Sequence, residues 1–90
     1  MKIIVFEPDR KGYVKEIENN LEECQKVVGG YIETVKFSTD IIIVCNEEGR
    51  LLNLPQNKFG IAGTFFMCAV KNDEFASVPE EKIDLILGFM

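Results

Sequence analysis

The sequence predicts a single α+β domain: a largely antiparallel sheet of five or six strands with two helices packed on one face. Three observations support this fold class. Short apolar runs rich in β-branched and aromatic residues alternate with glycine, proline, asparagine and aspartate. Two other segments repeat apolar residues at helical spacing. Most connections are as short as hairpins, which favours antiparallel pairing of consecutive strands.

The elements are expected in the order strand, strand, helix, strand, strand, strand, helix. The first two strands are predicted at residues 2–6 and 13–18, with turn chemistry in the PDRKG sequence between them. Either Asn19 or Asn20 can cap the first helix, with a glutamate three residues further on, as in a capping box. Gly29-Gly30 ends this helix, with one glycine in the left-handed conformation.

The next two strands are predicted at residues 31–37 and 41–45. We expect a tight hairpin turn from Asn46 to Gly49, with residues 50–52 as its returning arm, because asparagine and glycine suit such a turn. The apolar run at residues 61–70 is interrupted only by a glycine and a threonine. It therefore predicts the central, buried strand of the sheet.

The last helix is expected to start at a capping serine, Ser77, with Pro79 in its first turn. A glutamate follows at the position that completes a capping box. The apolar stripe that faces the sheet is then formed by Ile83, Ile86, Leu87 and Met90.

Length and composition exclude several classes of function. A chain of 90 residues forms one domain, residues 1–90. Its net charge of −5 disfavours direct binding to a nucleic-acid backbone. The apolar runs are far shorter than the ~20 residues of a membrane helix, and the N-terminal run is too short for a signal peptide. We therefore expect a cytoplasmic protein with no membrane contact.

The residues that usually carry catalysis do not form a recognisable set. The three cysteines lie far apart and the chain has no histidine, so we expect buried, reduced thiols and no metal site. The glycines fit neither a dinucleotide-binding nor a phosphate-binding loop, which leaves no cofactor to predict. Without histidine, a cysteine nucleophile also lacks its usual base. These observations predict a protein that is not an enzyme.

Two acidic residues are candidates for binding. Glu33 shares a predicted strand face with Tyr31, Val35 and Phe37, where a buried carboxylate needs a partner unless the face is only half covered. Glu47 lies with a second glutamate on the predicted turn. Adjacent acids do not converge on one substrate atom as paired catalytic carboxylates do, so a solvated turn is the alternative interpretation.

A second candidate site is a polar pocket formed by Asn46, Asn57, Gly63 and Thr64. The asparagine amides and the threonine hydroxyl would bind a ligand, and the glycine would let it approach closely. Arg50, together with Lys58, would supply positive charge. The alternative is that both asparagines bond their own backbone in turns, while Gly63 marks a β-bulge.

Four sequence words carry a resemblance to a known family. They are VGGYIE from Val28, CNEEGRL from Cys45, LPQN from Leu54 and IAGTFF from Ile61. In this order they resemble a family of small proteins described only as a domain of unknown function, frequent in phages and integrative elements of Gram-positive bacteria. The resemblance covers nearly the whole chain. Many relatives have a longer polar insert where this chain has only residues 58–60, so a function of that insert is not carried over.

The resemblance implies an accessory protein of a phage or mobile element. Together with the small size, the acidic charge and the missing catalytic groups, this context predicts a protein-binding or inhibitor module, with counter-defence as one form. It would dock on a host or element-encoded protein through an edge strand or an acidic face. The alternative is a protein that binds or sequesters a nucleotide-like small ligand, with its pocket at a homodimer interface. A third hypothesis is an acidic mimic of nucleic acid. The partner, the oligomeric state, the strand order and the burial of Glu33 are left open.

Overall fold

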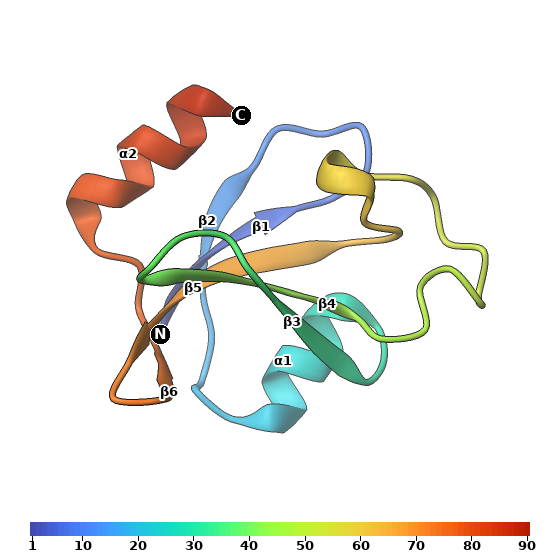
Figure 1. Ribbon diagram of the computed structural model, residues 1–90, viewed down its shortest axis with the longest axis horizontal. Helices are drawn as coiled ribbons and strands as arrows, with labels where there is room; N and C mark the ends of the chain where they lie inside the picture. The colour runs from blue at the N-terminus through green and yellow to red at the C-terminus, as the bar shows by residue number, and fades with distance from the viewer.

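Six strands form one antiparallel sheet in the computed structural model, which describes residues 1–90 (Figure 1). The sheet order is β2-β1-β5-β4-β3, and β6 pairs with β5 beside the start of β1. This confirms the predicted α+β class and the antiparallel sheet. The elements are β1 (Lys2–Phe6), β2 (Tyr13–Glu16), α1 (Leu21–Val28), β3 (Ile32–Lys36), β4 (Ile41–Asn46), the 3-10 helix η1 (Lys58–Gly60), β5 (Phe65–Lys71), β6 (Glu74–Ala76) and α2 (Glu80–Phe89).

The central strand is β5, as predicted, but it begins four residues later than the apolar run. Residues 65–69 are all buried between β1 and β4. Gly63 has a left-handed φ of 91°, which no extended strand residue adopts. The backbone N–H of Gly63 donates to the carbonyl of Pro55, and Ala62 forms an isolated bridge with Gln56. The first residues of the run are therefore tied to the preceding loop.

The two helices pack on opposite faces of the sheet, so the prediction of one shared face is wrong (Figure 1). Phe65 and Met67 of β5 lie in one apolar cluster with Ile83 and Ile86 of α2. The alternate residues of β5 lie in a second cluster with Cys24 and Val28 of α1. Because successive strand side chains point to opposite faces, a strand that is apolar throughout needs cover on both.

The first helix has the predicted caps, whereas the last does not. Asn20 caps α1, since its Oδ1 accepts a hydrogen bond of 2.8 Å from the backbone N–H of Glu23. Gly29 ends the helix with a φ of 80°. The predicted serine cap of α2 is wrong, because Pro79 precedes the helix and no side chain caps it. Ser77 instead accepts a hydrogen bond of 2.9 Å from the backbone N–H of Lys2 in β1.

The predicted hairpin after β4 is also wrong. From Asn46 to Gly49 the chain does turn, since the N–H of Gly49 donates to the carbonyl of Asn46. The chain then coils through further turns, with a bond of 2.8 Å from the N–H of Leu52 to the carbonyl of Glu48, and no strand follows. Both sides of β4 are already paired, with β3 and with β5. A returning arm at residues 50–52 therefore has no edge to pair with.

Candidate functional site

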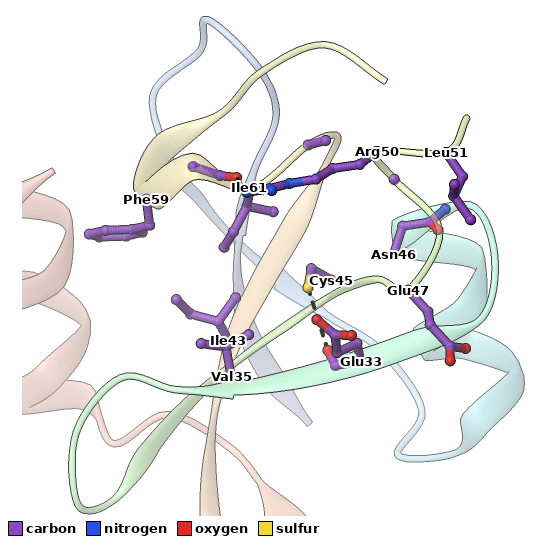
Figure 2. A pocket seen from close by; sticks show the side chains of 13 residues that line it. Glu33, Val35, Ile43, Cys45, Asn46, Glu47, Arg50, Leu51, Phe59 and Ile61 are labelled. Carbon is purple, nitrogen blue, oxygen red and sulfur yellow. Dashed lines mark hydrogen bonds between the residues drawn. The ribbon is translucent and has the colours of Figure 1, made fainter. Parts of the chain in front are cut away.

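Two grooves lie side by side on the face of the sheet that α2 covers only in part. The polar groove lies between the β3–β4 pair and the loop before β5, and it has a volume of about 450 Å³ (Figure 2). The aromatic groove lies between α2 and the β3–β4 turn, and it has a volume of about 520 Å³. Phe59 lines both grooves and so separates one from the other.

The polar groove brings together four of the predicted site residues: Glu33, Asn46, Glu47 and Arg50. Its apolar lining includes Ile43 of β4 and Ile61 of the loop. Four residues gathered from β3, the end of β4 and the following turn therefore surround an apolar centre (Figure 2).

Glu33 lies exposed on β3, at the edge of the sheet. It is paired with Cys45 of β4, whose thiol donates to the Glu33 backbone carbonyl over 3.6 Å (Figure 2). The carboxylate is therefore at the rim of the groove and needs no buried partner. This answers the question of Glu33 burial: the strand face is only half covered.

Asn46 is the only buried polar or charged residue of the chain, with 6% exposure. Its Nδ2 donates to the carbonyl of Val28 at 3.2 Å, and its Oδ1 accepts from the N–H of Glu48 at 2.8 Å. The amide therefore joins the end of α1 to the turn after β4. Both ends of this side chain bond the chain's own backbone, which favours the turn-making interpretation.

Arg50 and Glu47 lie at the same end of the polar groove but point in different directions (Figure 2). The guanidinium of Arg50 donates to the carbonyl of Gly60 at 3.2 Å, which links the turn to η1. Glu47 is exposed and points away from Arg50. Lys58, the second expected source of positive charge, does not line this groove; its Nζ lies 5.8 Å from the centroid of the Phe6 ring.

The predicted pocket of Asn46, Asn57, Gly63 and Thr64 is not formed. The Nδ2 of Asn57 donates to the carbonyls of Phe6 and Gly63, both at 2.9 Å, and its Oδ1 caps η1. Gly63 and Thr64 line a separate cleft beside the end of α1. A Cβ at position 63 would lie only 2.7 Å from Cδ1 of Leu54. Glycine at this position therefore allows the chain to pack closely against Leu54.

The aromatic groove was not predicted from the sequence. Its lining includes four large apolar side chains that are 42–90% exposed: Phe37, Phe59, Leu85 and Phe89. The rings of Phe37 and Phe59 meet edge to face, with centroids 5.8 Å apart. Leu85 and Phe89 are four residues apart on α2, outside the buried stripe of Ile83 and Ile86. That helical spacing was the available signal for a second apolar face.

Phe59 has a backbone conformation that is unusual for an aromatic residue. Its φ is 60° and its ψ is 23°, in the left-handed region that favours glycine. Asn57 on one side and the Arg50–Gly60 hydrogen bond on the other hold this segment in place. The result is an exposed ring at the junction of the two grooves.

The thiols are not placed for nucleophilic chemistry. Cys24, Cys45 and Cys68 are free and buried. Burial raises the pKa of each thiol, and that of Cys68 reaches about 12. Such thiols stay protonated at neutral pH, whereas the thiolate is the reactive form.

No group of three or more acidic, cysteine or histidine side chains is arranged to hold a metal ion. Neither helix combines the length and the apolar character needed to cross a membrane.

A protein-family model matches nearly the whole chain. The family model, described as a domain of unknown function (DUF3846), covers residues 1–89. Comparison with curated proteins and with solved structures found no match.

Proposed function

We propose that this chain, which belongs to the DUF3846 family, is a non-enzymatic protein-binding module and that its partner docks in the aromatic groove. The observation that carries the proposal is the exposure of Phe89 (90%), Leu85 (65%) and Phe59 (58%) around one concave surface. Large apolar side chains gathered on the surface of a small protein are typical of sites where another protein binds. Aromatic residues are also enriched among the residues that dominate binding energy.

The backbone of Phe59 supports the same site. A bulky residue in the left-handed region costs of order 1–3 kcal/mol, which the surrounding structure must offset. Here the ring stays 58% exposed, although its edges meet the rings of Phe37 and Phe65. A residue kept in an unfavourable conformation and exposed to solvent is better explained by a contact with a partner than by packing.

The wider context of the proposal follows the family resemblance. The module would be an accessory protein of a phage or mobile element, acting on a host or element-encoded protein, with inhibition or counter-defence as its effect. A cytoplasmic location is part of the proposal, supported by the three unpaired thiols. The acidic net charge of −5 favours a partner with a basic surface around the apolar contact.

The small-ligand alternative has less support. The polar groove has a suitable size, and Arg50 lies in it. However, the guanidinium of Arg50 is directed to Gly60, and the carboxylates of Glu33 and Glu47 lie at the same groove. Two nearby acids oppose the binding of an anionic, nucleotide-like ligand.

Site-specific photo-crosslinking in the native cell tests the proposal. A photoreactive phenylalanine analogue at Leu85 is expected to crosslink one protein of the cell, whereas the same analogue at Val14 on β2 is not. Val14 is the matched control because it is also an exposed apolar residue, but outside the groove. The Phe89→Ser variant is expected to reduce recovery of that protein at least tenfold.

Three results would overturn the proposal. One is equal crosslinking from Leu85 and Val14. Another is unchanged recovery with Phe89→Ser, a substitution that the fold tolerates because the ring is 90% exposed. Crosslinking of Leu85 only to a second copy of the chain would likewise exclude a foreign partner in this groove.

A further inference from the structure

We propose that β3 pairs with β3 of a second copy of the chain, so that one antiparallel sheet runs through a twofold-symmetric dimer. This surface is the free edge of the sheet, next to the grooves described above. The proposal does not depend on the partner proposed for the aromatic groove. It rests on the backbone groups, the charges and the apolar side chains of one strand.

The backbone of β3 has three residues that face away from β4. The backbone N–H of Phe37 donates to the carbonyl of Ile41, and the backbone N–H of Glu47 donates to the carbonyl of Tyr31. These two bonds show which residue pairs are hydrogen-bonded at the two ends of the β3–β4 ladder. In an antiparallel pair, bonded and non-bonded residues alternate. The N–H and C=O groups of Ile32, Thr34 and Lys36 therefore point to the open edge, where another strand can pair with them.

Charge disfavours two registers of such a pairing. A twofold axis that sets Glu33 opposite Glu33 of the second copy, or Lys36 opposite Lys36 of the second copy, puts like charges face to face, which destabilises a sheet. An axis at Thr34 avoids both contacts. It places Glu33 opposite Val35 of the second copy and Lys36 opposite Ile32 of the second copy.

The axis at Thr34 also pairs the whole strand. Every residue of β3, Ile32–Lys36, then has a partner within β3 of the second copy, which an axis at Val35 does not achieve. Just beyond the strand ends, Tyr31 lies opposite Phe37 of the second copy, and Phe37 lies opposite Tyr31 of the second copy. Tyr31 is 65% exposed and Phe37 is 42% exposed in the single chain. Aromatic pairs across strands are among the more stabilising ones.

The opposite edge of the sheet is a poor site for the same pairing. The backbone N–H of Ile17 donates to the carbonyl of Met1, so these two residues form a hydrogen-bonded pair. By the same alternation, the backbone groups of Val14 and Glu16 in β2 face away from β1. A twofold register that pairs these two residues sets Lys15 opposite Lys15 of the second copy. An axis at Val14 avoids that contact, but it leaves Glu16 opposite Gly12, which lies outside the strand. Neither register therefore pairs all of β2 with itself, whereas β3 pairs along its whole length.

The dimer would extend the polar groove. Residues with the same number lie on the same face of a sheet when an axis at Thr34 relates the two strands. Glu33 and Val35, which line the polar groove, would then lie beside Val35 and Glu33 of the second copy. The two polar grooves would meet at the twofold axis, with both α2 helices on one side of the joined sheet.

Molar mass in solution tests the proposal. Sedimentation equilibrium of the full chain over a wide range of concentrations is expected to give a dimer. Thr34→Pro is expected to give a monomer, because proline removes an outward N–H without breaking the β3–β4 ladder. Val14→Pro on β2 is the matched control, since it removes an outward N–H from the other edge. It is expected to remain dimeric.

Val35 reports the register. In the register with the axis at Thr34, Val35→Lys places each lysine opposite Glu33 of the other copy and is expected to tighten the dimer roughly threefold or more. Val35→Glu places two acids opposite each other and is expected to weaken it by a similar factor. An axis at Val35 would instead make Val35→Lys weaken the dimer.

The outcomes separate clearly. A wild-type chain that is monomeric at all concentrations, or a folded Thr34→Pro chain that remains dimeric, overturns the proposal. Should Thr34→Pro fail to fold, the opposite effects of Val35→Lys and Val35→Glu still decide, and equal effects overturn the register. Phe89→Ser is expected to stay dimeric, so the proposed partner site and the dimer fail or stand separately.

Discussion

Asn46 shows how one polar side chain stabilises three segments of this small protein. Asn46 is the last residue of β4, and its amide forms hydrogen bonds with the end of α1 and with the turn after β4. Gly30 allows the close approach, because a Cβ there would lie 2.9 Å from Nδ2 of Asn46. The buried amide has bonds on both its donor and acceptor sides, as burial of a polar group requires.

Asn46→Ala is therefore expected to lower the free energy of unfolding by about 1–3 kcal/mol, since the carbonyl of Val28 and the N–H of Glu48 lose their partners. Urea unfolding followed by circular dichroism measures this change. The neighbouring substitution Glu47→Ala is the control and is expected to change stability by less than about 0.5 kcal/mol, because that side chain is exposed. Equal stabilities of the two variants would contradict a structural role for Asn46.

The other predictions at single residues concerned helix caps and turns. They are confirmed where the hydrogen-bond partner is a near neighbour in the sequence. The Asn20 cap and the left-handed Gly29 are examples, because both act within one helical turn. Ser77 has similar chemistry but lies next to β1, where the backbone N–H of Lys2 is a competing donor. A contact between residues 75 positions apart is not visible in the local sequence.

At the scale of elements, the turns decide which strands pair. The β5–β6 hairpin was not predicted, although its loop is short: Lys71 pairs with Glu74, which leaves Asn72 and Asp73 as the central residues. Their φ angles are 53° and 64°, as a type I′ turn requires. Asparagine and aspartate both tolerate this conformation, but the pair is a weaker signal than Asn-Gly.

Asp73→Gly is expected to raise the free energy of unfolding by about 0.5 kcal/mol, because glycine adopts a positive φ without the penalty that a Cβ causes. Asp73→Ala is the matched variant and is expected to lower stability, since alanine has a Cβ and no side chain to bond the turn. Thermal unfolding of both variants measures the difference. The prediction fails when the two substitutions shift the midpoint in the same direction.

At the scale of the whole molecule, the sheet has one apolar core on each face. Cys68 belongs to the core under α1, where it is fully buried, and burial raises the pKa of its thiol to about 12. An unfolded cysteine ionises near its ordinary pKa of 9.0. Between these two values the unfolded state loses a proton that the folded state keeps, so stability falls as pH rises.

The contribution of Cys68 to stability is therefore expected to be complete below about pH 9 and to decline by about 1.4 kcal/mol for each pH unit above it. Urea unfolding at pH 7, 9 and 10.5 measures the decline. Cys68→Ala removes this contribution, so its stability should fall less steeply over the same range. Parallel pH profiles for the two proteins would show that the thiol does not titrate in this way.

The two grooves are likewise formed only by the whole molecule, from elements that lie far apart in the sequence. The polar and aromatic grooves are formed where β3 and β4 extend beyond the cover that α2 gives, with the loop before β5 as the far wall. Phe37 directly follows β3, whereas Phe59 lies in η1 and Phe89 in α2, so the three rings are distant in sequence. The sequence placed Glu33, Asn46, Glu47 and Arg50 as candidates, but only the fold brings them to one groove.

The sequence alone determined the α+β class, the buried central strand and the caps of α1. These features depend on the apolar pattern along the chain and on bonds between near neighbours. Tertiary structure alone decided that the helices cover opposite faces, that β4 has no room for a further arm and that an aromatic groove stays open. Each of these depends on which sheet edges and faces are already occupied, and occupancy is fixed by contacts between residues far apart in the chain.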